Sequence, residues 1–135
     1  MKRLLIIKCF LLIGFFGKAQ KDTLACKGLP IVSISFSIQN FSFVSDSVSI
    51  SVDSIRTGFK LSLLDKTFKV IGYRAYYETD DSDVYYRDIY GDSVDQNNFP
   101  ILKNVKKGAL IFLECINLSK DKRRYSRKPL IIYII

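Results

Sequence analysis

The residues with the clearest capacity for chemistry are carboxylates that follow a tyrosine-rich segment. They are Asp80, Asp81, Asp83, Asp88, Asp92 and Asp95. Two suitably spaced carboxylates can hydrolyse a glycoside, and clustered carboxylate oxygens can bind calcium. Aspartates between strands are more often turn formers, and the EF-hand pattern is absent. We therefore expect a solvated turn at 80–83, with a calcium site or a carboxylate hydrolase as the alternatives.

The sequence contains no histidine. This excludes histidine-based general acid–base catalysis, Ser–His and Cys–His nucleophiles, and histidine-containing zinc sites. The chain also lacks a glycine-rich phosphate loop and the HExxH zinc motif. We therefore predict a protein that is not an enzyme and that has no small-molecule substrate, metal or cofactor.

Residues 1–19 have the layout of a secretory signal peptide. Lys2 and Arg3 precede an apolar run at 4–16, and Gly17 and Ala19 occupy the small-residue positions that signal peptidase prefers. An uncleaved anchor is the alternative, but the run is shorter than the roughly 20 residues that span a membrane. We expect cleavage after Ala19, export, and no transmembrane helix in the mature chain.

Cleavage changes how the charge and the cysteines are interpreted. Four of the cationic residues behind the formal net charge of +8 leave with residues 1–19, so nucleic acid is not an expected partner. Cys9 leaves as well, and Cys26 and Cys115 remain as a pair in an oxidising compartment. A disulfide between them would contribute roughly 4–5 kcal/mol in the chain-entropy model. The alternatives are two separate buried thiols, or a lipid-modified Cys26, which the polar residues before it disfavour.

A basic cluster with one tyrosine lies near the end of the chain. It contains Lys120, Lys122, Arg123, Arg124, Tyr125, Arg127 and Lys128. We consider it a candidate interaction patch for an acidic protein face, an acidic glycan or a lipid headgroup. The alternative is a charged hairpin between a strand that ends near Ile116 and one that begins at Leu130.

The elements that must position these residues are predicted to be strands. Apolar and polar residues alternate at 31–38, 48–52 and 59–63, and branched or aromatic runs follow at 68–77, 84–90, 109–116 and 130–135. Asp, Ser, Gly and Asn clusters separate these runs, and no segment has a convincing helical stripe. We predict an all-β sandwich at 31–135, as a single domain, preceded by a polar lead-in at 20–30.

Two stretches resemble a known family signature. TGFKL at 57–61 and TFKVIGY at 67–73 resemble the "SGF-x-L … F-x-V-x-(S/G)-(F/Y)" pattern of the C-terminal periplasmic domains of GldM, a component of the gliding-motility and type IX secretion motor. LKNVKKG at 102–108 is similar to the family's basic segment, and the apolar positions 111, 113 and 116 to its "I-x-F-x-x-I" strand. The chain departs from the family at 118–122, where GldM often has a Gly-Pro-Asp-Gly turn. It also lacks the motor protein's transmembrane helix and tandem domains, so we expect a free-standing relative.

The resemblance implies an immunoglobulin-like sandwich that contacts other proteins in the periplasm rather than outside the cell. It implies core positions at Phe59, Leu61, Phe68 and Val70, and bends at Gly58, Gly72 and Gly108. We expect a non-catalytic interaction module of the bacterial cell envelope, accessory to gliding motility or type IX secretion. The alternative is a secreted adhesive sandwich that binds carbohydrate or protein through its tyrosines. These are Tyr73, Tyr76, Tyr77, Tyr85, Tyr86 and Tyr90, of which alternation places about half outside.

Overall fold

The computed structural model describes residues 24–38, 41–43, 46–79 and 83–135. The expected signal peptide at 1–19, and with it the predicted cleavage after Ala19, lies outside these ranges. Within them, no helix has the length and apolar character that crossing a membrane requires.

The described residues form strands linked by short turns and two short helices. The elements are β1 (Phe36–Ile38), β2 (Phe41–Phe43), β3 (Ser47–Ile50), α2 (Val52–Arg56), β4 (Phe59–Leu63), β5 (Lys69–Glu78), β6 (Val84–Tyr90), β7 (Ser93–Val94), the 3-10 helix η2 (Pro100–Asn104), β8 (Leu110–Lys120), β9 (Arg123–Arg127) and β10 (Leu130–Ile134). This composition confirms the predicted all-β class.

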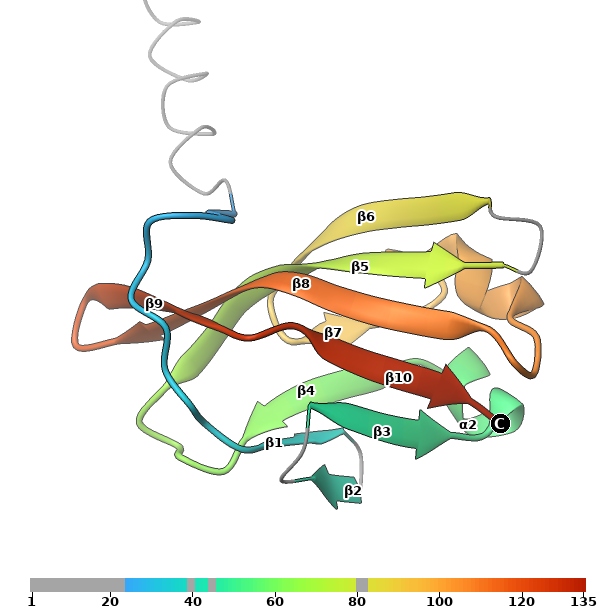
Figure 1. The fold of residues 1–135 in the computed structure, drawn as a ribbon, viewed down its shortest axis with the longest axis horizontal. Coiled ribbons are helices and arrows are strands. Elements are labelled where there is room, and N and C mark those ends of the chain that lie inside the picture. Colours follow the sequence, from blue (N-terminus) through green and yellow to red (C-terminus); the bar gives the residue numbers. More distant parts are fainter. Residues whose placement is uncertain (1–23, 39–40, 44–45, 80–82) are drawn as a thin grey trace, which may run out of the picture.

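Two sheets pack face to face (Figure 1). The smaller has the strand order β2-β1-β4-β7, and the larger has the order β3-β10-β8-β5-β6, with β9 paired to β8. Neighbouring strands are antiparallel, except that β3 runs parallel to β10. Strand β6 is therefore an edge of the larger sheet. The β8–β9 hairpin projects from one end of the sandwich, and β6 begins at the other end (Figure 1).

The core lies between the sheets and follows the predicted alternation. Phe59 and Leu61 of β4 face Tyr73 of β5 and Ile111 of β8, and all four side chains are buried. Phe59 and Leu61 thus occupy the inward positions that the resemblance implies, whereas Phe68 and Val70 are only partly buried at the margin of the core. Because strand side chains alternate, the opposite faces of both sheets are left toward solvent.

Irregular pairing between β5 and β8 changes which residues of β8 face the core. Gly72 pairs with Asn117 while Arg74 pairs with Glu114, so β8 contains one extra residue between these pairs. Cys115 lies in this bulge with a φ of 48°, in the left-handed region. The bulge places Leu113 and Ile116 on the same inner face, although the sequence spacing between them is odd.

Two predicted strands are shorter than the alternation suggests. In the segment 31–38, only Phe36–Ile38 is a strand, because the Val32 amide donates to the Ser126 carbonyl (2.9 Å) instead of entering the smaller sheet. The predicted strand at 48–52 ends at Ile50, because the Ser51 hydroxyl accepts from the Ser54 amide (3.2 Å) and caps α2.

The predicted lead-in is fixed to the sandwich where it is described. Leu24 is buried against Gly72, where a side chain on residue 72 would collide with both Leu24 and the Ile89 carbonyl. Cys26 forms a disulfide with Cys115, as predicted, with 4.5 Å between their Cα atoms. The residues at 24–26 therefore cover part of the outer face of the larger sheet.

Candidate binding surfaces

The predicted basic cluster occupies a projecting β-hairpin. Strand β8 continues to Lys120, past the predicted end near Ile116, and 123–127 forms a strand of its own. Asp121 and Lys122 make the turn with φ values of 50° and 64°, the combination of a type I′ hairpin turn. The predicted charged hairpin is thus present, but its second strand is β9 rather than β10, the strand that begins at Leu130.

The cationic side chains of this hairpin differ widely in exposure. Lys122, Arg123 and Lys128 are exposed, Lys120, Arg124 and Tyr125 are partly buried, and Arg127 is buried. The cluster therefore presents fewer free charges than its sequence suggests.

Arg127 is a structural residue, with 8% of its surface exposed. Its Nε donates to the Ile34 carbonyl (3.1 Å), and its Nη1 donates to Asp46 Oδ1 (2.8 Å) and the Lys128 carbonyl (3.1 Å). The guanidinium also stacks 4.8 Å from the centre of the Phe36 ring. These contacts join β9 to the chain before β1 and place Arg127 outside the candidate interaction patch.

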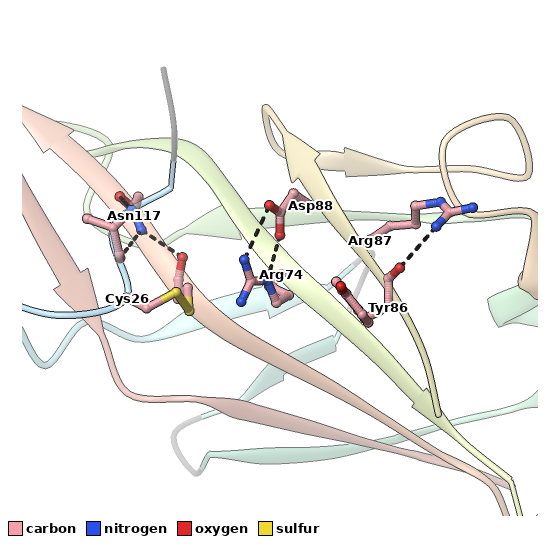
Figure 2. Close-up of polar contacts among 8 residues, drawn as sticks. Cys26, Arg74, Tyr86, Arg87, Asp88 and Asn117 are labelled. Atoms are coloured by element: carbon pink, nitrogen blue, oxygen red, sulfur yellow. Dashed lines mark hydrogen bonds and ion pairs between the residues drawn. A yellow bond between two sulfur atoms is a disulfide. The ribbon is translucent and has the colours of Figure 1, made fainter. Parts of the chain in front are cut away.

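Arg124 belongs to a polar network at the base of the hairpin. Its Nη2 donates to Asn117 Oδ1 (3.2 Å), which also accepts from the Ala25 amide (3.0 Å). Asn117 Nδ2 donates to the carbonyls of Ala25 (2.8 Å) and Cys115 (2.7 Å), beside the disulfide (Figure 2). Asn117 is fully buried, so these bonds replace water and fasten the segment at 24–26 to β8.

A groove with Phe68 in its lining opens beside this hairpin. Lys120 Nζ lies 4.9 Å from the centre of the Phe68 ring, and Tyr125 packs edge-on against the same ring at 5.5 Å. The groove has a volume of about 400 Å³. Its lining, which we call the basic groove, consists of Lys60, Leu61, Ser62, Leu63, Lys66, Phe68, Lys69, Val70, Gly91 and Asp92.

Carboxylates offset only part of the positive charge around the basic groove. Asp92 lies 3.7 Å from Lys60 in an exposed ion pair. The hydroxyl and amide of Thr67 donate to Asp65 and lower the pKa of that carboxyl, and the nearby Lys120 lowers it further. Lys66, Lys69 and the hairpin tip remain as an excess of cations. The groove residues are scattered at 60–92, so the sequence cluster at 120–128 did not reveal them.

Three of the aspartates considered for catalysis or calcium, Asp88, Asp92 and Asp95, have other roles in the structure. Asp88 accepts from Arg74 Nε (2.7 Å), and this bond raises the pKa of Arg74 (Figure 2). Asp95 accepts from the amides of Asn97 (2.8 Å) and Asn98 (3.0 Å), as turn-forming aspartates do. Asp80 and Asp81 lie outside the described residues. Among the residues that are described, no three or more Cys, Asp or Glu side chains converge as metal ligands would.

The tyrosines divide between the core and the surface. Tyr73 and Tyr77 are buried, Tyr76 is partly buried, and Tyr85, Tyr86 and Tyr90 are 48%, 57% and 59% exposed. Tyr73 donates to the Asp92 carbonyl (3.2 Å), and burial raises the pKa of its phenol. The expectation that alternation leaves about half of these tyrosines outside is confirmed.

The outer face of the larger sheet carries a continuous apolar row. Register places Ile131 of β10 opposite Phe112 of β8, Phe112 opposite Tyr76 of β5, and Tyr76 opposite Tyr86 of β6. The Tyr76 and Tyr86 rings are 5.8 Å apart. We call these four residues the outer row. Alternation predicts the direction of each side chain, but only the pairing of distant strands aligns them.

No protein-family model matches this chain, and no curated protein matches it significantly. The GldM-like family remains an expectation from the sequence.

Proposed function

We propose that this chain is a non-catalytic interaction module of the bacterial cell envelope that binds an acidic face of another protein. The observation that carries this proposal is the basic groove. Lys60 comes from β4, Lys66 from the turn that follows it and Lys69 from the start of β5, and Lys120 of β8 lies over Phe68 of the lining, so two distant parts of the sequence bring cations to one hollow. These cations become neighbours only when the chain folds, so no single segment of the sequence contains the surface that they form.

The chemistry of the basic groove suits a protein partner. Phe68 and Val70 offer an apolar floor at which a partner side chain can be desolvated, and such buried anchors carry most of the binding energy in protein interfaces. The exposed cations of the lining, Lys66 and Lys69, would speed association with an acidic surface and select against basic ones. An acidic peptide segment with one apolar anchor fits both features.

The cellular setting is proposed from the sequence. Residues 56–135 resemble the C-terminal domains of GldM, which supports an accessory role in gliding motility or type IX secretion. The disulfide is compatible with an oxidising compartment such as the periplasm. The matched positions include core residues and no catalytic ones, which agrees with a binding role.

A charge-reversal pull-down tests the proposal. The tagged chain is cross-linked in native envelopes, and its partners are compared with those of the double variant Lys66→Glu/Lys69→Glu, which reverses two exposed lysines of the groove lining. The control variant Lys103→Glu/Lys107→Glu reverses two exposed lysines around η2, away from the groove. We expect the groove variant to lose acidic partners that the control retains, and added salt to weaken their recovery. Equal recovery with both variants would contradict the proposal.

A secreted adhesive sandwich is the second candidate, because Tyr85, Tyr86 and Tyr90 are exposed together on β6. Exposed tyrosines offer large amphipathic surfaces at low entropic cost. Binding on a glycan array that is lost in Tyr85→Ser and unchanged in Lys66→Glu/Lys69→Glu would favour this candidate over the envelope module.

A further inference from the structure

Strand β6 presents an unpaired backbone edge among the described residues. It pairs with β5 on one side, and no described strand lies on the other (Figure 1). The Thr79 amide donates to the Asp83 carbonyl, and the Gly91 amide donates to the Ile71 carbonyl, so odd-numbered residues of this strand bond to β5. Because bonding groups alternate along a strand, the amides and carbonyls of Val84, Tyr86 and Asp88 point to the open edge.

The side chains along this edge are unusually apolar for an exposed strand. Val84, Tyr85 and Tyr86 are each about half exposed, and Tyr86 ends the outer row. Natural edges are commonly protected by charged residues, prolines or a covering loop. Here Arg87 Nη1 donates to the outward carbonyl of Tyr86 at 3.3 Å (Figure 2), and Phe99 and residues of η2 line a pocket of about 250 Å³ together with Tyr85, Tyr86 and Arg87. No described strand covers the edge itself.

We infer that β6 pairs with β6 of a second copy of this chain, antiparallel about a two-fold axis through Tyr86. A two-fold axis perpendicular to the sheet keeps each side chain on its own face. Odd-numbered residues of one copy must therefore lie opposite odd-numbered residues of the other, and even-numbered residues opposite even-numbered ones. The axis can then pass through Tyr86, Arg87 or Asp88 while most of β6 stays paired. An axis through Arg87 sets two arginines opposite each other, and one through Asp88 sets two aspartates opposite each other, which is unfavourable in both cases.

The register centred on Tyr86 sets no like charges opposite each other from Val84 to Asp88. It places Tyr86 opposite its copy, Tyr85 opposite Arg87 of the second copy, and Val84 opposite Asp88 of the second copy. The outward amides and carbonyls of residues 84, 86 and 88 then form hydrogen bonds with those of the second copy. The Arg87 guanidinium gives up its contact with the Tyr86 carbonyl and lies over the ring of Tyr85 of the second copy. The outer row continues from one copy into the other through the two Tyr86 side chains.

Cysteine cross-linking tests this register directly. Tyr85 and Arg87 of opposite copies form a non-hydrogen-bonded pair, in which the side chains approach most closely. We expect the double variant Tyr85→Cys/Arg87→Cys to form a disulfide-linked dimer under mild oxidation. The single variants Tyr85→Cys and Arg87→Cys are matched controls and should stay monomeric on a non-reducing gel. Cross-linking of Arg87→Cys alone, or none in the double variant, would overturn the register.

Sedimentation equilibrium of the exported chain tests the interface itself. Tyr86→Lys sets two charges opposite each other at the axis, and we expect the dimer dissociation constant to rise by at least about tenfold. Tyr133→Lys is the control, because Tyr133 is an exposed tyrosine on the same face but lies on β10, whose neighbours are both present. Circular dichroism and thermal unfolding establish that both variants fold. A wild-type chain that is monomeric at all concentrations overturns the inference. The basic groove is not involved, so this result is independent of the proposed function.

Discussion

The β8–β9 hairpin and the β6 edge lie at different ends of one sheet and use their residues in opposite ways. The hairpin is rich in charge, yet Arg127 is buried, Arg124 bonds to Asn117, and Lys120 lies over Phe68. Strand β6 is rich in apolar residues, yet Tyr85 and Tyr86 are about half exposed. Cations thus stabilise the fold at one end, while aromatic residues face solvent at the other.

This contrast shows that residue type alone does not locate a binding surface. A guanidinium can be buried when backbone carbonyls and a carboxylate satisfy its donors, as they do for Arg127. A tyrosine stays exposed when its side chain points away from the core, or when its strand extends beyond the opposite sheet. We therefore expect substitutions of the packed cations of the hairpin mainly to affect stability, and substitutions of the exposed tyrosines of β6 mainly to affect association.

The largest expected effect comes from removing the disulfide. The double variant Cys26→Ser/Cys115→Ser should lose about 4 kcal/mol of unfolding free energy, because the unfolded chain is no longer constrained. Urea denaturation of the variant and of the wild type measures this loss. Hydrogen exchange should accelerate at Ala25 and at the base of the hairpin. An equal acceleration in β6 would show that the two ends are not distinct.

Removing the buried guanidinium should have the next largest effect. Arg127→Ala leaves the carbonyl of Ile34 and the carboxylate of Asp46 without their donor, and we expect a loss of about 2–3 kcal/mol. Asp46 is about half exposed, which keeps the loss below that of a fully buried pair. Lys122→Ala in the same hairpin is the control and should change stability by less than about 0.5 kcal/mol. Similar thermal shifts in both variants would contradict the structural role of Arg127.

The buried phenol of Tyr73 predicts an alkaline pH dependence. Burial raises its pKa above the ordinary value of 10.0, so the folded state holds the proton more tightly than the unfolded state. The resulting stability is complete below about pH 10 and falls as the pH rises further. Tyr73→Phe should cost about 1 kcal/mol at neutral pH through the lost hydrogen bond to Asp92. Its stability should fall less steeply above pH 10 in urea denaturation, and parallel curves for the two proteins would argue against this role.

The smallest expected effect concerns the ion pair beside the β6 edge. Arg74 and Asp88 are each 29% exposed and lie 2.7 Å apart, so Asp88→Asn should cost at most about 1 kcal/mol. Thermal unfolding at low and high salt measures the electrostatic part of that loss. A loss as large as that of Arg127→Ala would show that charges stabilise both ends equally.

The sequence predicted the fold class, part of the core and the two cysteines of the disulfide, with separate thiols and a lipid-modified Cys26 as the alternatives. Alternation with period two states which side of a strand is apolar, and it correctly placed Phe59 and Leu61 inside. Two cysteines left after an expected signal peptide admit one pairing, and Cys26 and Cys115 form it. These inferences succeed because they depend on local periodicity or on counting, and neither requires knowledge of which strands are neighbours.

The tertiary structure alone decided where the candidate surfaces lie. The bulge at Cys115 shifts the register of β8 and places Asn117 where it is buried against Ala25. Beyond this bulge, simple alternation no longer predicts which residues of β8 face the core. The outer row and the basic groove each combine residues from several strands, and their assembly depends on strand order and register. Long-range pairing is chosen by the total free energy of packing rather than by any local segment, so no local pattern could reveal that Tyr86 ends an apolar row or that Phe68 lies beneath Lys120.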